Sequence, residues 1–345
     1  MDHITPFNNC PALDGYHCQT NSLAKILYFH NCPLSEEMIL GLGAGLGFIY
    51  WQMKGMVFIG GRGNVKNFYH DLGRRVSVKM EVKSTSSPKK AEQILVEKLH
   101  QKEPMMLYGD MGFLPWFDFP VEYHFGGHTF VACGYDGENT VLASDIDQKA
   151  TGLKKGFYFP ITLEKLQKAR SSLYRPFPPK NSYIDFDCSK YHSPQAQDIY
   201  SSIHQTIDAM LNPPIRNIGI KGLRYSASEI FKWPKKYDDQ VLRMTLLSLY
   251  IFIEIGGTGG GCFRYMYSRF LREAAEIING HALEQASQMF NESGSHFSAL
   301  GNLFKDAETS SEIDKKIIES SKLFNTIADI EEKAFKYLSG NIPNN

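Results

Sequence analysis

The strongest constraint on the fold is a change of pattern about halfway along the 345-residue chain. Up to residue 170, short runs that alternate apolar and polar residues predict strands, interspersed with helical segments. Beyond residue 195, apolar residues recur at helical spacing almost to the end. Between them, residues 174–191 are rich in Pro, Asn, Asp and Ser, which is typical of a linker or of a domain edge. The sequence therefore predicts an α+β domain over residues 1–185 and an all-helical domain over residues 186–345.

Charge and hydropathy exclude several functional classes. Lys+Arg and Asp+Glu both number 37, so the formal net charge is zero and no broad attraction to nucleic acid or membrane is expected. The first residues show no basic region followed by an apolar stretch, so no signal peptide is predicted. The longest apolar run, residues 246–255, is too short to span a bilayer. We expect a cytoplasmic protein with no nucleic-acid or membrane partner.

The cysteines do not form a metal or disulfide pattern. Six are scattered along the chain without a Cys-x-x-Cys pair, so we expect neither a zinc site nor a redox dithiol. Without a secretion signal, a disulfide framework is not expected either, and most cysteines should be reduced core residues. They lie at positions 10, 18, 32, 133, 188 and 262.

One cysteine lies where a thiol can become a nucleophile. Cys18 follows a turn, and the apolar residues after it, from Leu23 to Phe29, are spaced for one face of a helix. At a helix N-terminus, unpaired backbone N–H groups and the helix dipole favour a thiolate over a thiol. Cys18 is therefore a candidate nucleophile, although free cysteines are usually small buried hydrophobes.

A predicted β-hairpin supplies a candidate base and a candidate acid. The turn Asp-Gly-Glu-Asn separates two β-branched and apolar arms. If Gly134 pairs with Asn139, Asp145 lies opposite His128, whereas a register two residues longer places Asp147 there. Both acids share a face with His128, so spacing alone leaves the choice open.

Two other histidines compete as the base. His17 is adjacent to Cys18, and neighbours on a helix do not face each other. His124 precedes a Gly-Gly pair that predicts a loop. A cysteine that attacks a carbonyl, an imidazole that transfers the proton and a carboxylate that orients the imidazole are the parts of a Cys–His–Asp catalyst.

Several segments together resemble a known family. A helix that begins at a cysteine, a His-x-Phe-Val-x-x-Gly-Tyr-Asp segment and a strand ending in Asp are similar to papain-like bacteriocin-leader cysteine peptidases. The chain resembles the family of butirosin biosynthesis protein H more closely, over nearly its whole length and in the same order. The segments concerned are Tyr16-His17-Cys18, Leu34-Ser35-Glu36-Glu37, Gly41-Leu42-Gly43-Ala44-Gly45-Leu46-Gly47-Phe48-Ile49-Tyr50, Gly256-Gly257-Thr258-Gly259-Gly260-Gly261-Cys262-Phe263-Arg264 and Tyr267-x-x-Phe270-Leu271-x-Glu273-Ala274.

The resemblance implies both a fold and a reaction. The fold is a papain-like domain with an antiparallel sheet, followed by a helical domain. The triad is Cys18, His128 and Asp145, with Asp145 preferred over Asp147. The reaction is transfer of an acyl group from a carrier-protein thioester to an amine in antibiotic biosynthesis, so the partners are an acyl carrier protein and a small-molecule amine. No cofactor is expected, because the acyl group travels on phosphopantetheine.

Two other functions stay open. A papain-like peptidase or amide hydrolase would use the same triad with water as the acceptor. A non-catalytic ligand-binding protein could keep the fold, although all three triad residue types are present. The oligomeric state is open as well, a homo-oligomer included.

The chain departs from the papain-like pattern at the oxyanion hole. Such enzymes usually carry a glutamine several residues before the cysteine, but position 12 is Ala12 and no glutamine precedes Cys18. The backbone N–H of Cys18 can serve as one donor. Asn8, Asn9 and Gln19 are the candidates for another.

The first glycine-rich segment, residues 41–47, lacks the Gly-Lys-Ser/Thr ending of a P-loop, and no strand leads into it. We expect tight packing near the Cys18 helix rather than ligand contact. Glu36 and Glu37 are expected in the first turn of a helix capped by Ser35.

The second glycine-rich segment, residues 256–261, is expected to join two apolar helices. Arg264 follows it, and a cation in the first turn of a helix opposes the helix dipole, so it needs a partner. Glu254 is one candidate. The other is an anionic ligand such as the phosphate of phosphopantetheine, with Gly259 and Gly260 beside it.

Overall fold

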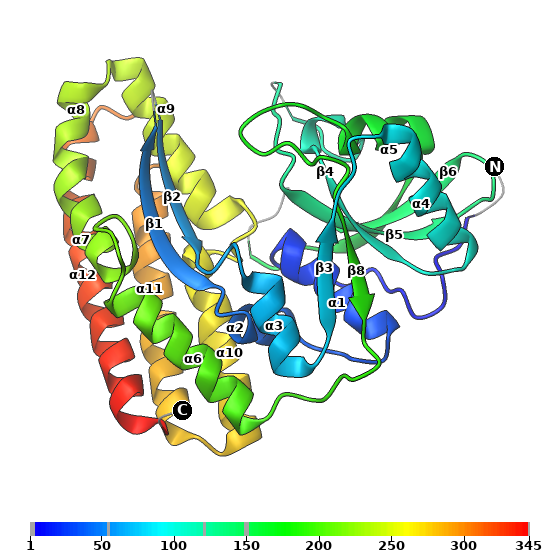
Figure 1. The fold of residues 1–345 in the computed structure, drawn as a ribbon. Coiled ribbons are helices and arrows are strands. Elements are labelled where there is room, and N and C mark those ends of the chain that lie inside the picture. Colours follow the sequence, from blue (N-terminus) through cyan, green and yellow to red (C-terminus); the bar gives the residue numbers. More distant parts are fainter. Residues whose placement is uncertain (1–3, 54–55, 120–121, 148–151, 344–345) are drawn as a thin grey trace. The chain divides into compact units, whose positions relative to one another are not determined.

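The computed structural model describes residues 4–53, 56–119, 122–147 and 152–343 (Figure 1). The chain forms two units, each assembled from two separate stretches. Unit 1 comprises Met1–Ile39 and Val76–Ser193, and unit 2 comprises Leu40–Arg75 and Pro194–Asn345. The chain therefore passes from unit 1 into unit 2, back to unit 1 and again into unit 2, instead of changing once near residue 185.

Unit 1 is built on a six-stranded antiparallel sheet with the strand order β3-β8-β4-β5-β6-β7. Its strands are β3 (Lys79–Lys83), β4 (Met105–Gly109), β5 (His128–Tyr135), β6 (Thr140–Ile146), β7 (Gly156–Thr162) and β8 (Tyr183–Asp187). Its helices are α1 (Cys18–Phe29), α4 (Pro88–His100), α5 (Leu163–Arg170) and the 3-10 turn η1 (Met111–Phe113). The helix α2 (Glu36–Leu42) crosses the division between the units.

Of the two interpretations of residues 174–191, the linker is wrong, whereas the domain edge agrees with the end of unit 1 at Ser193. These residues contain β8, which lies between β3 and β4 in the sheet. Lys79 pairs with Asp187 and Met106 with Ile184, so the partners of β8 lie about 80–110 residues earlier in the chain. Local composition shows the turn-forming residues that flank β8, but it carries no information about a partner so far away.

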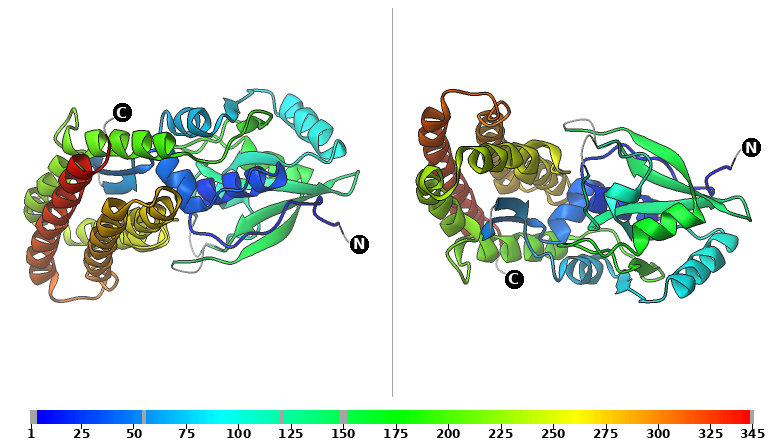
Figure 2. Two further views of the ribbon diagram at one scale, coloured as in Figure 1. Left: turned by 90° about the horizontal axis from the view of Figure 1, so that it is seen from below. Right: turned by 90° about the horizontal axis from the view of Figure 1, so that it is seen from above.

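The two faces of the sheet are covered by different helices. Figure 2 shows α1 on one side of the sheet and α5 on the other. The core beneath α4 and α5 includes Leu95, Leu166, Phe130 and Ala143, each at most 2% exposed. Leu23, Ile26 and Leu27 of α1 are fully buried. The α+β class predicted from the sequence is therefore confirmed.

Local signals placed two helix starts correctly. α1 begins at Cys18, and α4 begins at Pro88. The side chain of Ser87 caps α4, because it accepts a hydrogen bond from the backbone N–H of Lys90 at 3.2 Å. Short-range chemistry suffices at such positions, since the capping groups lie within one turn of each other.

Unit 2 is mainly helical, and it also holds an antiparallel pair of strands. The strands are β1 (Leu46–Met53) and β2 (Met56–Arg62). The helices are α3 (Phe68–Val76), α6 (Ala196–Leu211), α7 (Gly219–Glu229), α8 (Trp233–Lys236), α9 (Asp239–Tyr250), α10 (Arg264–Ile278), α11 (His281–Asn302) and α12 (Ile313–Asn341), with the short turns η2 (Ile230–Lys232), η3 (Ile251–Ile255) and η4 (Gly261–Phe263). The C-terminal helical region is confirmed, but the unit it belongs to is not entirely helical.

Aromatic contacts attach the strand pair to these helices. The ring of Tyr50 on β1 stacks on Trp233 with 6.3 Å between centroids, and its hydroxyl accepts a hydrogen bond from the indole N–H. Phe48, also on β1, contacts Phe297 of α11 and Phe324 of α12. Burial of such large rings against helices contributed by residues 194–345 explains why residues 40–75 belong to unit 2.

The first glycine-rich segment packs tightly, as predicted, and its neighbours include aromatic rings. A Cβ at Gly41 would lie 2.2 Å from the Phe270 ring, and one at Gly43 would lie 2.2 Å from the Phe68 ring. Both rings belong to unit 2. These glycines therefore allow the two phenylalanine rings to approach the backbone closely within unit 2.

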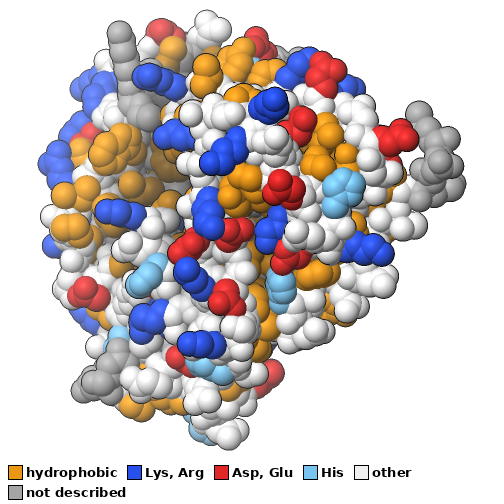
Figure 3. Space-filling view, turned by 45° about the vertical axis from the view of Figure 1, so that its right-hand side comes forward, with side chains coloured by type: hydrophobic (Ala, Val, Ile, Leu, Met, Phe, Trp, Pro, Cys, Tyr) orange, Lys and Arg blue, Asp and Glu red, His pale blue; other side chains and the backbone are white. Residues whose placement is uncertain are grey.

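The charges on the surface and the hydropathy of the helices both agree with the expectations from the sequence. On the face drawn in Figure 3, basic and acidic side chains are intermingled. Within the described part of the chain, every helix is too short or too polar to cross a membrane.

Arg264 and Glu331 form a buried ion pair that joins α10 to α12. The guanidinium donates to the carboxylate from Nε at 2.7 Å and from Nη2 at 3.1 Å, and both side chains are fully buried. Nη1 donates to the backbone oxygen of Cys262 at 2.8 Å, and the cation lies 4.5 Å from the centre of the Phe297 ring. A bidentate pair with further hydrogen bonds offsets the cost of burying both charges.

We expect Glu331→Ala to lower the free energy of unfolding by about 3–5 kcal/mol, because it leaves the Arg264 charge buried without its partner. The adjacent Glu332 offers a matched control, since it pairs with Arg224 and Lys336 at the surface. Glu332→Ala should cost about 1 kcal/mol or less. Chemical denaturation of both variants checks this, and equal losses would contradict it.

Candidate active site

Cys18 is the first residue of α1, as the sequence predicted. The preceding residue, His17, has extended backbone angles of φ −131° and ψ 128°, so the helix starts abruptly at the cysteine. The side chain of Cys18 is partly exposed. The nucleophile therefore lies at the positive end of the helix dipole and can be reached from solvent.

His128 and Asp145 form a buried pair on neighbouring strands. His128 Nε2 lies 2.7 Å from Asp145 Oδ2, and each side chain is 2% exposed. The second carboxylate oxygen, Oδ1, accepts the backbone N–H of Ile146 at 2.8 Å. Because Nε2 is engaged by the carboxylate, Nδ1 is the ring nitrogen left to exchange a proton with Cys18.

Near His128 the hairpin has the longer of the two registers considered, yet the carboxylate that binds His128 is that of Asp145. Gly134 pairs with Leu142 rather than Asn139, and a bulge lies between the pairs of Ala132 and Gly134. Continued to the start of β5, the pairing of Val131 with Ser144 brings Asp147 opposite His128. His128 instead bonds to Asp145, its diagonal neighbour on the same face.

The charges around Cys18 and His128 favour transfer of a proton from the thiol to the imidazole. Burial raises the pKa of the Cys18 thiol, but the charge of His128, hydrogen bonding to its imidazole and a backbone hydrogen bond from Thr129 outweigh this and lower the pKa overall. Burial lowers the pKa of His128, but the charges of Asp145 and Cys18 raise it to about 10. Opposite shifts of this kind stabilise a thiolate–imidazolium pair at neutral pH.

Two aromatic residues that the sequence did not single out support this pair. The indole N–H of Trp116 donates to Asp145 Oδ2 at 2.9 Å, and its ring stacks on Phe159 with 4.9 Å between centroids. Phe117 lies edge-on to the imidazole of His128, with 5.1 Å between centroids. Asp145 Oδ2 thus accepts two hydrogen bonds from groups held by ring packing, which restricts its orientation.

Glu36 does more than occupy the first turn of α2. Its buried carboxylate accepts the backbone N–H groups of Tyr16 at 2.9 Å and His17 at 3.1 Å, and the side chains of Thr20 and Asn21 also donate to it. Residues 16 and 17 immediately precede the nucleophile, so the carboxylate anchors the turn that presents Cys18. The sequence reasoning missed this role because 15–20 residues separate Glu36 from the groups that donate to it.

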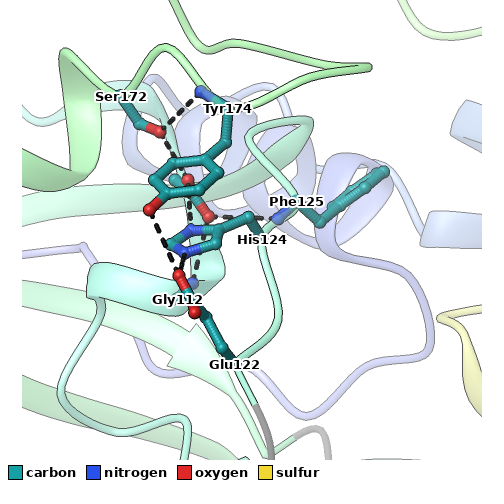
Figure 4. Close-up of polar contacts among 7 residues, drawn as sticks. Gly112, Glu122, His124, Phe125, Ser172 and Tyr174 are labelled. Carbon is teal, nitrogen blue, oxygen red and sulfur yellow. Dashed lines mark hydrogen bonds and ion pairs between the residues drawn. The ribbon is translucent and has the colours of Figure 1, made fainter.

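His124, the competing base, belongs to a separate polar cluster (Figure 4). Its Nδ1 lies 2.9 Å from Asp110 Oδ2 and its Nε2 lies 3.1 Å from Glu122 Oε1. Tyr174 stacks on the ring with 3.4 Å between centroids, and Ser172 also donates to Asp110. Both ring nitrogens of His124 are therefore engaged by carboxylates in this cluster.

The remaining candidate binding residues are dispersed. Asn8 and Asn9 lie in an exposed turn, and Gln19 is half-buried in the first turn of α1. Gly259 and Gly260 have φ of 71° and 79° and form a turn of unit 2. Glu254, the partner suggested for Arg264, instead accepts Gly261 N–H and the Ser298 hydroxyl.

The ion pair with Glu331 accounts for the charge of Arg264 without a ligand. Among the described residues, no three His, Cys, Asp or Glu side chains are grouped as a metal site would require.

Two family models match the sequence. The model described as "Butirosin biosynthesis protein H, N-terminal" matches residues 17–146, the stretch that contains Cys18, His128 and Asp145. The model described as "Domain of unknown function (DUF4872)" matches residues 164–338, half of the chain. The chain belongs to the butirosin biosynthesis protein H-like family. Membership of this family implies an enzyme of antibiotic biosynthesis. No curated protein matches the chain.

In this family member, we expect iodoacetamide to alkylate Cys18 faster than the other cysteines, with a rate that reaches its half-maximum below the pH typical of a free thiol. His128→Ala should move that midpoint upward, because the charge and the hydrogen bond of His128 no longer lower the pKa of Cys18, whereas burial still raises it. Cys188 is the internal control: it is also partly exposed, but burial and the charge of Cys32 raise its pKa to about 12. Peptide mapping of a pH series measures both, and equal labelling would contradict the prediction.

A second expectation concerns Glu36. Burial raises the pKa of its carboxyl from 4.5 to about 7 although hydrogen bonds from Thr20, Tyr16 and His17 oppose this. A raised pKa means that protonation of Glu36 stabilises the folded state. This contribution to the free energy of unfolding is full below about pH 4.5 and is lost as the pH rises through about 7. The unfolding free energy of the wild type minus that of Glu36→Gln should therefore fall across this range. A difference that does not change with pH would contradict it.

Proposed function

We propose that the chain is a cysteine acyltransferase with a papain-like catalytic domain. In this proposal it moves an acyl group from a carrier-protein thioester to an amine acceptor during antibiotic biosynthesis. Cys18 is the nucleophile, His128 the acid and base, and Asp145 the residue that orients the imidazole. The observation that carries the proposal is the buried bond from His128 to Asp145, with the lowered pKa of Cys18 at the start of α1.

The first half-reaction follows from the charges in the site. The Cys18 thiolate attacks the carbonyl carbon of the thioester, a new C–S bond forms, and an electron pair moves onto the carbonyl oxygen. Collapse of this intermediate breaks the original C–S bond, and the departing thiolate takes the proton of the His128 imidazolium. The products are the free carrier thiol, a neutral imidazole and an acyl-enzyme on Cys18.

The second half-reaction uses the neutral imidazole as a base. An amine attacks the acyl carbon, its proton passes to His128, and the thiolate of Cys18 leaves. The amide is released and the thiolate–imidazolium pair is restored. Water in place of the amine would make the same site a hydrolase, so the acceptor alone separates the two functions.

The family supports acyl transfer over hydrolysis. The matched model is named for the biosynthesis of an antibiotic, and it covers the stretch that holds the proposed triad. We propose an acyl carrier protein as the donor, with phosphopantetheine carrying the acyl group, and a small-molecule amine as the acceptor. No further cofactor is needed for this chemistry.

The test is single-turnover acylation followed by intact-mass measurement. We expect butyryl-N-acetylcysteamine, a short thioester resembling the end of phosphopantetheine, to add one butyryl group to the wild type. Cys18→Ala should lose the adduct, whereas Cys188→Ala, which changes another partly exposed cysteine, should retain it. Adding a panel of primary amines should then discharge the adduct as amides. Discharge only to the free acid would contradict acyl transfer, and an adduct that persists in Cys18→Ala would contradict the nucleophile.

A further inference from the structure

The proposed reaction needs a group to stabilise the oxyanion. When the Cys18 thiolate attacks a carbonyl, negative charge develops on the oxygen, and donors aimed at it contribute strongly to the rate. The backbone N–H of Cys18 is one such donor, but no glutamine precedes this cysteine. Asn8 and Asn9 lie in an exposed turn, and exposed side chains are poor oxyanion donors because solvent competes for them.

A buried lysine lies beside the nucleophile turn. Lys154 forms an isolated antiparallel bridge with Gly15, three residues before Cys18. Gly15 N–H donates to Lys154 O at 2.8 Å, and Lys154 N–H donates to Gly15 O at 2.7 Å. The side chain of Lys154 is 1% exposed, so its ammonium group is buried rather than extended into solvent.

Neighbouring contacts hold this bridge in place. The carboxylate of Asp14 accepts the backbone N–H of Gly156 at 3.0 Å and the ammonium group of Lys155 at 2.6 Å. A Cβ at Gly156 would lie 2.4 Å from the backbone oxygen of Leu13, so the two segments are in close contact. Lys154 is thus attached to the same turn that presents Cys18.

The charges that act on Lys154 are those of the active site. Burial lowers its pKa, and the charges of Cys18, Asp145, Asp147 and Glu36 oppose this, with Cys18 the strongest of them. The ammonium group is therefore within electrostatic reach of the nucleophile. Burying an ammonium group is costly unless negative charge is nearby, and formation of the acyl-transfer intermediate moves the negative charge of the Cys18 sulfur onto the carbonyl oxygen.

Among the described residues of unit 1, Lys25 is also a buried lysine, and it fits this role less well. It lies seven residues after Cys18 on α1, two helical turns into the core, and its Nζ has no hydrogen-bond partner. The charges that act on it are those of Asp145, Cys133, Glu36 and Cys10. The charge of Cys18 is the strongest of those acting on Lys154 but is not among the strongest acting on Lys25.

We propose that the ammonium group of Lys154 completes the oxyanion hole of this enzyme, in place of the missing glutamine. In the acylation step it donates an N–H to the carbonyl oxygen as the Cys18–carbon bond forms and the electron pair moves onto that oxygen. When the intermediate collapses, the C=O double bond returns and Lys154 keeps its proton. This inference rests on the proposed function, because it assigns a catalytic residue to the same reaction.

The test compares two reagents that both consume the Cys18 thiolate. p-Nitrophenyl acetate acylates it through a tetrahedral oxyanion, whereas iodoacetamide alkylates it by direct displacement with no oxyanion. Both rates are measured against pH and compared on the plateau where the thiolate is fully formed. The burst seen with Cys18→Ala is subtracted, so that only acylation of Cys18 is counted.

We expect Lys154→Met to lower the acylation plateau about 100-fold, the loss typical of one oxyanion donor, and to leave the alkylation plateau within about twofold. Lys154→Arg retains a cationic donor and should recover part of the loss. Lys168→Met is the control: its side chain is 61% exposed and pairs with Glu164 on α5, and both plateaus should be unchanged.

Two results would overturn the inference. Equal loss on both plateaus would mean that Lys154 supports the structure of the site, and Lys154→Arg would then be expected to fail as well. Unchanged plateaus with an upward shift of both pH profiles would mean that Lys154 only stabilises the thiolate. Failure of wild-type Cys18 to be acylated would contradict the proposed function itself, and the role of Lys154 with it.

Discussion

The pairing of His128 with Asp145 is the contact on which the active site depends. Both side chains are almost completely buried, and an isolated charge there would be strongly unfavourable, so each requires the other. The hydrogen bond from Trp116 and the close Phe117 ring restrict the pair further. The charge of His128 then lowers the pKa of Cys18. The pair formed between β5 and β6 therefore controls the reactivity of the thiol at the start of α1.

Other buried charged groups also require partners, and they find them in distant parts of the chain. Glu36 lies in α2, yet its carboxylate satisfies the backbone N–H groups that precede Cys18. Arg264 and Glu331 are 67 residues apart and join α10 to α12. In each case a buried charged group is satisfied by partners that are remote in sequence. Loss of one partner leaves the other uncompensated, so these contacts restrict the arrangement of helices and turns as well as stabilising them.

Much of the fold and part of the site could be predicted, and the failures share one cause. Helix starts at Cys18 and Pro88, the hairpin of β5 and β6, and the helices after residue 195 depend on neighbours within a few residues. The assignment of β8 to a linker failed because its partners lie 80–110 residues earlier. The choice between two hairpin registers stayed open because spacing alone does not show the bulge between Ala132 and Gly134, which changes the pairing along β5.

The sequence by itself determined the α+β class, the position of Cys18 at the start of a helix, and the presence of a histidine and two acids on one face of a hairpin. These follow from residue periodicity and turn chemistry, which act over short distances. Tertiary structure decided that Asp145 rather than Asp147 binds His128, that residues 40–75 pack with unit 2, and that Glu36, Trp116 and Lys154 lie around the nucleophile turn and the His128–Asp145 pair. Such choices depend on burial and on partners remote in the chain, and no local pattern records them.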